Sequence, residues 1–180
     1  MKYYFLILTL LLFSNPSSAQ KLPPPSPCLT DPIYRQFDFW IGDWEAFNLK
    51  GMKAGDSRIS LILDSCTILE EWTNVPVPNG FGYKEKSFNT YNAATKQWQQ
   101  SWTDNMGGST FYAFGKAEDK KIVFQTTPWP FSKDTMAISR LSFFNLGPDK
   151  VRQLGEISKD AGVSWATQYD LEYRRKKSQR

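Results

Sequence analysis

The sequence predicts an all-β domain, an antiparallel up-and-down β-barrel of about ten strands. From residue 43 onward, segments rich in Thr, Tyr, Phe, Trp, Val and Ile alternate with turn sequences. A sustained helical period is missing, and residues 33–41 are the one short exception. The connections are too short for crossover helices, and closing the sheet into a barrel removes its edges. The alternative is a β-sandwich, which needs longer connections for Greek-key crossings.

Ten strands are expected, and their boundaries follow from the turn signals between them. We place them at residues 43–50, 56–64, 66–75, 83–91, 96–104, 109–117, 120–127, 135–145, 150–158 and 164–175. The turns include Pro78-Asn79-Gly80 and Gly147-Pro148-Asp149. Because successive side chains of a strand point to opposite faces, the sequence also predicts which residues face the barrel interior.

The first 19 residues have the pattern of a secretory signal peptide. Lys2 supplies the positive start, Phe5–Phe13 the apolar run, and Ser17-Ser18-Ala19 the small-residue cleavage site. The apolar run is too short to remain as a membrane span. We therefore expect export to the periplasm or the medium. The expected organisation is a signal peptide at 1–19, a proline-rich segment at 20–30, the barrel at 31–175 and a basic tail at 176–180.

Two cysteines, Cys28 and Cys66, are the only ones in the chain. In an oxidising compartment this even number favours a single disulfide, and the alternative is two unrelated buried thiols. The chain has no histidine and no Cys-x-x-Cys spacing, so we expect no metal site and no cofactor.

The net charge of +4 is concentrated at the C-terminus, where the last seven residues hold five positive charges. The rest of the chain is close to neutral. A basic end of this kind is usually solvated and sometimes contacts an anionic surface. A nucleic-acid partner is not expected, because the basic residues do not form a face with interleaved aromatic side chains.

Alternation in the third and fifth strands predicts an aromatic interior with a few polar side chains. Glu70 and Trp72 share the inner face of the third strand. On the fifth strand, Trp98 and Trp102 point inward with Gln100 between them. Buried polar groups need partners, since an unpaired buried charge is very costly.

The partners are expected on later strands. Arg140 is predicted to lie inside and to pair with Glu70, with Gln153 as a further hydrogen-bonding group and Tyr169 as part of the wall. One hypothesis is a barrel that binds a small apolar or aromatic molecule, oriented by the polar residues. The alternatives are a filled barrel serving as an envelope structural or interaction protein, and a carboxylate-dependent enzyme. The absence of histidine excludes histidine-based triads.

The stretch Phe37–Glu45 reads FDFWIGDWE and contains a Gly-x-Trp pair, Gly42 and Trp44. With this motif the chain resembles a family of exported bacterial proteins known as a domain of unknown function and marked by FDFW-x-G-x-W-E. Further matching segments are Cys66–Trp72, Tyr91, Trp98–Asp104, Arg140, Val151–Gln153 and Trp165–Tyr173. The resemblance implies a lipocalin-like, calycin-type barrel, without an established reaction or ligand.

In lipocalin-like barrels the tryptophan of Gly-x-Trp packs under an arginine from the last strand. By this resemblance, Trp44 would lie at the closed end of the barrel, beneath Arg175 or Arg174, and strand alternation favours Arg175. The barrel is also similar in outline to nitrobindin, a haem-binding barrel. Haem ligated by histidine is impossible here, because the chain contains none.

Overall fold

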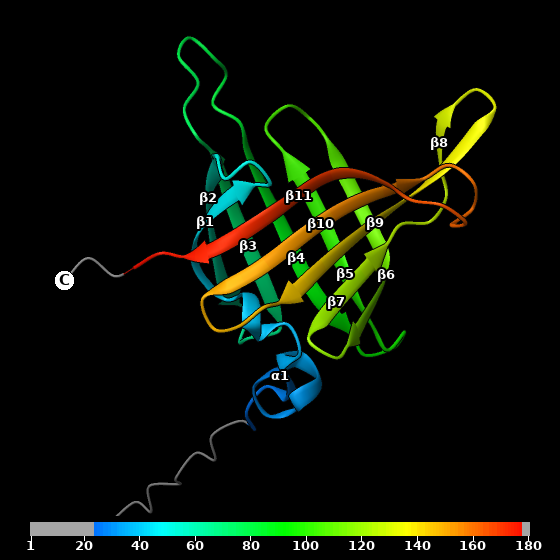
Figure 1. Ribbon diagram of the computed structural model, residues 1–180. Helices are drawn as coiled ribbons and strands as arrows, with labels where there is room; N and C mark the ends of the chain where they lie inside the picture. The colour runs from blue at the N-terminus through cyan, green and yellow to red at the C-terminus, as the bar shows by residue number, and fades with distance from the viewer. Residues whose placement is uncertain (1–23, 178–180) are drawn as a thin grey trace, which may run out of the picture.

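The computed structural model describes residues 24–177 and confirms the predicted barrel (Figure 1). Ten antiparallel strands form a closed ring, and one more short strand pairs with it. The first and last strands of the ring, β1 (Gly42–Asn48) and β11 (Ala166–Arg175), pair with each other. On the other side of the ring, β9 (Thr135–Asn145) pairs with both β7 (Lys121–Gln125) and β10 (Lys150–Ser158). The expected signal peptide and the last three residues of the basic tail lie outside the described residues.

The strands of the ring follow one another along the chain as hairpins. Their bounds are β1 (Gly42–Asn48), β2 (Lys53–Ile62), β3 (Thr67–Asn74), β4 (Lys84–Asn92), β5 (Gln97–Asp104), β6 (Ser109–Glu118), β7 (Lys121–Gln125), β9 (Thr135–Asn145), β10 (Lys150–Ser158) and β11 (Ala166–Arg175). The additional strand, β8 (Trp129–Ser132), pairs only with β9 and was not predicted. It is short and contains a proline, so its strand pattern in the sequence is weak.

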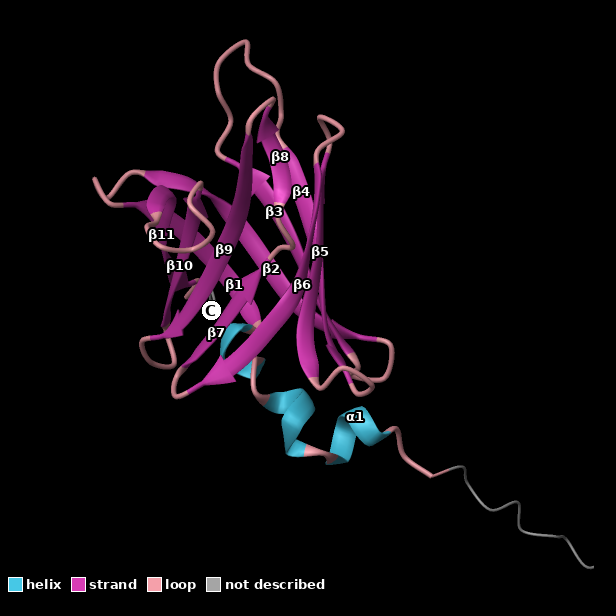
Figure 2. Cartoon of the chain, turned by 90° about the vertical axis from the view of Figure 1, so that its right-hand side faces the viewer, coloured by secondary structure: helices cyan, strands magenta, loops and turns pink. Residues whose placement is uncertain are grey.

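Short helical segments cover one end of the barrel, here called the closed end (Figure 2). They are α1 (Pro27–Thr30), η1 (Pro32–Arg35) and η2 (Asp38–Trp40). Proline begins the first two, where its missing N–H costs no hydrogen bond. The Asp31 carboxylate accepts a hydrogen bond from the backbone N–H of Ile33 at 2.9 Å, which starts η1.

The predicted disulfide between Cys28 and Cys66 is confirmed. It joins α1 to the turn between β2 and β3, across 38 residues of sequence. A second contact reinforces it, because the Arg35 guanidinium donates a hydrogen bond to the carbonyl of Ser65 in the same turn. The helical segments are therefore attached to the barrel both covalently and by hydrogen bonding.

An aromatic core fills the closed end. Phe37 stacks on Trp40 with ring centroids 5.1 Å apart, and both rings contact Phe143 of β9. The fully buried large side chains here are Phe37, Trp40, Trp44, Phe124, Phe143 and Tyr173. The stretch that opens the fold thus serves as a plug for this end of the barrel.

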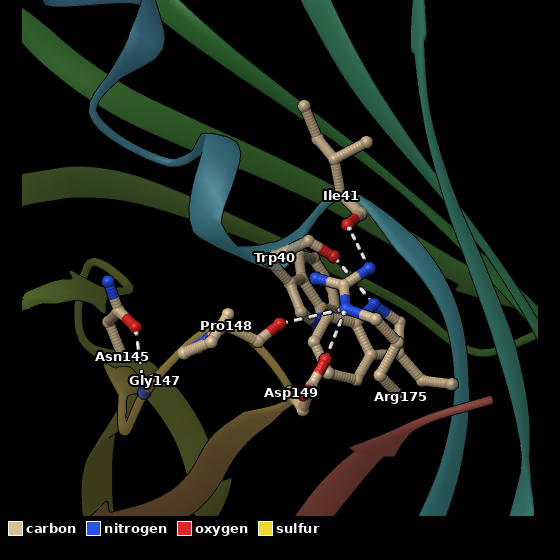
Figure 3. A network of polar contacts seen from close by, with 8 residues as sticks. Trp40, Ile41, Asn145, Gly147, Pro148, Asp149 and Arg175 are labelled. Carbon is tan, nitrogen blue, oxygen red and sulfur yellow. Dashed lines mark hydrogen bonds and ion pairs between the residues drawn. The ribbon is translucent and has the colours of Figure 1, made fainter. Parts of the chain in front are cut away.

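Trp44 is covered by the last strand. The Arg175 guanidinium carbon lies 4.2 Å from the centroid of the Trp44 ring, and the Trp44 indole N–H donates to the carbonyl of Trp40 at 2.8 Å. Arg175 also donates to the carbonyls of Ile41 and Pro148 (Figure 3). Gly42 has a φ of +139°, and a Cβ at this position would collide with the Arg175 guanidinium. Glycine is therefore required for this arrangement.

Within residues 24–177, no helix has the length and apolar character needed to span a bilayer. The same part of the chain holds no group of three or more His, Cys, Asp or Glu side chains placed to bind a metal ion.

Candidate functional site

A cavity of about 420 Å³ occupies the barrel at the end opposite the helical segments, here called the open end. Its size falls in the usual range for small-molecule pockets. The side chains around it come from strands β3 to β6 and β8 to β11. They are Glu70, Trp72, Asn74, Tyr83, Glu85, Gln100, Trp102, Thr110, Tyr112, Trp129, Ser139, Leu141, Gln153, Gln168, Tyr169 and Leu171.

Glu70 lies at the floor of the cavity and is only 1% exposed. Its two carboxyl oxygens accept hydrogen bonds from Ser57 at 3.0 Å and Ser87 at 2.9 Å. Burial, followed by the nearby Glu85 carboxyl, raises the pKa of Glu70 to about 8, although the hydrogen bonds from the two serines act in the opposite direction. Glu70 is therefore a carboxyl group that can hold a proton near neutral pH.

The Tyr173 hydroxyl connects Glu70 to Gln153. It donates its single hydrogen to Gln153 Oε1 at 2.6 Å, and its oxygen lies 3.4 Å from Glu70 Oε1. A phenol has one hydrogen to donate, so the contact with Glu70 is satisfied when Glu70 is protonated and donates to the phenol oxygen. The geometry around Tyr173 thus matches a neutral Glu70.

Gln100, also 1% exposed, presents an acceptor without a partner. Its Nε2 donates to Asn89 Oδ1 at 2.8 Å, while Asn89 Nδ2 donates to the carbonyl of Ile68 at 3.2 Å. The Ile68 carbonyl can only accept, which fixes the orientation of the Asn89 amide and hence that of Gln100. Gln100 Oε1 is left buried with no hydrogen-bond partner among residues 24–177. An orphan of this kind is costly unless a donor reaches it from the cavity.

A second carboxyl lies nearer the mouth of the cavity. Glu85 accepts a hydrogen bond from the Tyr83 hydroxyl at 2.7 Å, and the same hydroxyl is 3.3 Å from Asp104. The net effect of the surroundings is a raised pKa for Glu85. Burial is the main cause and the Asp104 charge adds to it, whereas hydrogen bonds from Tyr83 and Trp102 act in the opposite direction. Burial, followed by the Glu85 charge, raises the pKa of Tyr112 to about 12, so that phenol stays neutral.

Two glycines make room for the aromatic wall. A Cβ at Gly55 would lie 2.5 Å from the ring of Trp72, and a Cβ at Gly155 would collide with the ring of Tyr169. Each ring therefore lies directly over glycine backbone on the neighbouring strand. Tyr169 is 39% exposed and forms part of the mouth, whereas Trp72 is buried.

Arg140 does not lie inside the barrel, so the predicted ion pair with Glu70 is wrong. Its guanidinium pairs with Glu156 at 2.8 Å and lies over the ring of Trp165, 3.9 Å from the centroid. On β9 the inward residues are Ala137, Ser139, Leu141 and Phe143, the opposite set to the one predicted. The cavity consequently has no Arg–carboxylate pair of the kind considered for an enzyme.

Trp98 faces inward but not into this cavity. Its indole N–H donates to Gln36 Oε1 at 3.1 Å, and its ring packs against Phe37 and Tyr91 in the closed-end core. The other predicted site residues, Glu70, Trp72, Gln100, Trp102, Gln153 and Tyr169, all line the cavity. Strand alternation gives the face of a residue but not its height along the barrel axis.

Several cavity residues were not predicted. Glu85 and Tyr112 lie on the inner faces of β4 and β6, where alternation could have placed them, whereas Trp129 comes from the unpredicted strand β8. Tyr173 shares a face of β11 with Tyr169 by strand alternation, but its link to Gln153 depends on the pairing of β10 with β11. That pairing is a long-range property that a strand pattern does not contain.

A larger hollow of about 580 Å³ lies outside this cavity, near the closed end. It runs between η1 and the ends of β5, β6 and β7, and includes the exposed charges of Lys96, Lys116 and Glu118. Its buried polar group, the Trp98 indole, is already paired with Gln36. The smaller cavity is the better candidate because its buried polar atoms converge and one of them lacks a partner.

A scan of the chain against protein-family models gives no match. A search among curated protein sequences gives no match either. The resemblance to the exported family with the FDFW-x-G-x-W-E motif therefore stays a prediction.

Proposed function

We propose that this protein binds one small, largely apolar or aromatic molecule inside the open end of its barrel. The observation that carries the proposal is the cavity above Gln100. A structural barrel would be filled there with side chains, whereas a cavity of about 420 Å³ is far larger than a few water molecules need. Aromatic side chains supply most of its large surfaces, and a few polar groups converge at its floor.

We also propose that the protein is exported. The signal-like start of the sequence supports this, and so does the Cys28–Cys66 disulfide, because such bonds persist in oxidising compartments. Fractionation of the native host tests it: mature protein in the periplasm or medium is expected, and full-length protein retained in the cytoplasm would contradict it.

Ligand binding is tested by native mass spectrometry of protein purified from its own host, together with calorimetric titration of 2-phenylethanol as a neutral aromatic probe. Thr110→Trp places a large side chain at the cavity wall, and is expected to weaken binding by at least about tenfold. Ser101→Trp is the matched control, because Ser101 is exposed on the neighbouring strand. Empty protein in the mass spectrum, together with absent or Thr110-independent probe binding, would contradict the proposal.

A further inference from the structure

The ionisable carboxyl groups that line the cavity have no basic side chains beside them. Two carboxyl groups, Glu70 and Glu85, line it, and none of its lining residues is a lysine or an arginine. Arg140, which the sequence predicted inside the barrel, lies outside it and is paired with Glu156. The two carboxyls therefore have no cationic side chain beside them among the lining residues.

The buried polar atoms at the floor of the cavity can accept hydrogen bonds from a ligand. Gln100 Oε1 is an acceptor with no partner in the described part of the chain. Glu70 accepts from two serines, and an ionised carboxylate has room for further donors. A ligand group that donates several hydrogen bonds fits this floor, whereas a group that only accepts would leave Gln100 Oε1 without a partner.

The walls above the floor also suit a positive charge. Trp72, Trp102 and Tyr112 line the cavity beside the two carboxyls. Aromatic faces attract cations electrostatically, and the attraction increases when the cation is removed from water. The same chain uses this contact elsewhere, since guanidinium groups lie over Trp44 and Trp165.

We infer that the ligand of this cavity is an organic amine in its protonated form, with an aromatic or aliphatic body. The inference rests on the proposed function and adds the ligand's charge. The ammonium group would point to the floor, toward Gln100 Oε1 and Glu70, which releases its proton to solvent when the cation lies beside it, with Glu85 as a second carboxyl. The body would lie between the aromatic walls. We do not expect a carboxylate ligand such as a fatty acid, because none of the lining residues is a cation that could pair with it.

Three probes of matching shape separate the ligand's charge from its body: 2-phenylethylamine, 2-phenylethanol and phenylacetate. Each is titrated calorimetrically into the full mature protein at pH 8. The amine is expected to bind at least about tenfold more tightly than the alcohol, and phenylacetate more weakly than both. Equal or tighter binding of the alcohol, or any preference for the acid, would overturn the inference while leaving the binding function in place. Absence of binding by all three would overturn both.

Variants of Glu85 and Glu70, with a control at Glu71, locate the charge selectivity. Glu85→Gln keeps the size of the side chain and is expected to reduce binding of the amine about tenfold, with little change for the alcohol. Glu71→Gln is the control, because Glu71 lies next to Glu70 on the outer face of β3 and pairs with Lys86. Circular dichroism and thermal melting verify that both variants fold. An amine preference that survives in both Glu85→Gln and Glu70→Gln would contradict the assigned position of the ammonium group.

Discussion

At the closed end of the barrel, aromatic rings fill the interior and Arg175 covers Trp44, whereas at the open end a cavity is lined by two carboxyls and by Gln100, whose amide oxygen has no partner among the described residues. The same ten strands run through both ends. The difference lies in the inward residues along each strand: on β3, for example, Ile68 faces the aromatic core and Glu70 the cavity. The packed aromatic core and the proposed binding cavity thus lie at opposite ends of one sheet.

The largest loss of stability is expected from Trp44→Ala, which removes the aromatic plug from beneath Arg175. Trp44 is fully buried, so the free energy of unfolding should fall by about 3–5 kcal/mol. Urea denaturation at pH 7 measures this. Phe111→Ala is the control, because Phe111 is exposed on the outside of β6, and a loss in Trp44→Ala no greater than in this control would remove the distinction between the ends.

Removal of the disulfide should have the next largest effect. The double variant Cys28→Ala/Cys66→Ala frees the helical segments from the β2–β3 turn and is expected to lower the free energy of unfolding by about 2–4 kcal/mol. Because the bond lies at the closed end, affinity for an aromatic probe in the cavity should remain within about twofold at a temperature where the variant is folded. A large loss of affinity in folded protein would show that the two ends are coupled.

The pH dependence of stability should be governed in part by Glu70. Its pKa is about 8 in the folded protein and 4.5 for an unperturbed glutamate, so between these values the folded state holds a proton that the unfolded state releases. Stability should therefore fall as pH rises through this window, by up to about 1.4 kcal/mol per pH unit. The groups facing Glu70 are Glu85, whose pKa is also raised, and Tyr173, which stays neutral there.

Glu70→Gln tests this slope by urea denaturation at pH 5, 6, 7 and 8. The variant should gain stability relative to the natural protein as pH increases. Glu71→Gln, the exposed neighbour, should follow the natural protein, since the pKa of Glu71 is lowered by Lys86 and not raised. Parallel curves for Glu70→Gln and the natural protein would mean that Glu70 is ionised throughout.

The smallest effect is expected from an added methyl group at the open end. In Gly155→Ala the new Cβ displaces the ring of Tyr169, which is 39% exposed, so the free energy of unfolding should change by less than about 1 kcal/mol. The same substitution at Gly42 meets Arg175 and an unfavourable φ, and should cost about 1–3 kcal/mol. Thermal melting compares the two, and equal costs would contradict the proposed difference in packing.

The sequence was sufficient to predict the fold class, the disulfide, and the inward faces of β3 and β5. Both tryptophans of β5 lie on one face and only polar residues on the other, so only one face could be the interior. On β9 both faces carry apolar residues, and the inner one, which includes Ala137 and Ser139, looked less apolar than the outer one with Met136 and Ile138. The pairing of β9 with β10, which places Glu156 opposite Arg140, determines which face of β9 is the inner one. The residue pattern of β9 alone does not contain that pairing.

The packing of Arg175 over Trp44 has a consequence for the order of folding. Ile41 and Arg175, which share a hydrogen bond, are separated by 134 residues, and β1 cannot complete its pairing until β11 is available. Contacts between such distant segments form late and make folding slow. During synthesis, the aromatic rings of β1 therefore stay uncovered on this side until β11, the last ten residues of the sheet, is available. A chain that ends before β11 is expected to stay open along β1 and to associate through that edge.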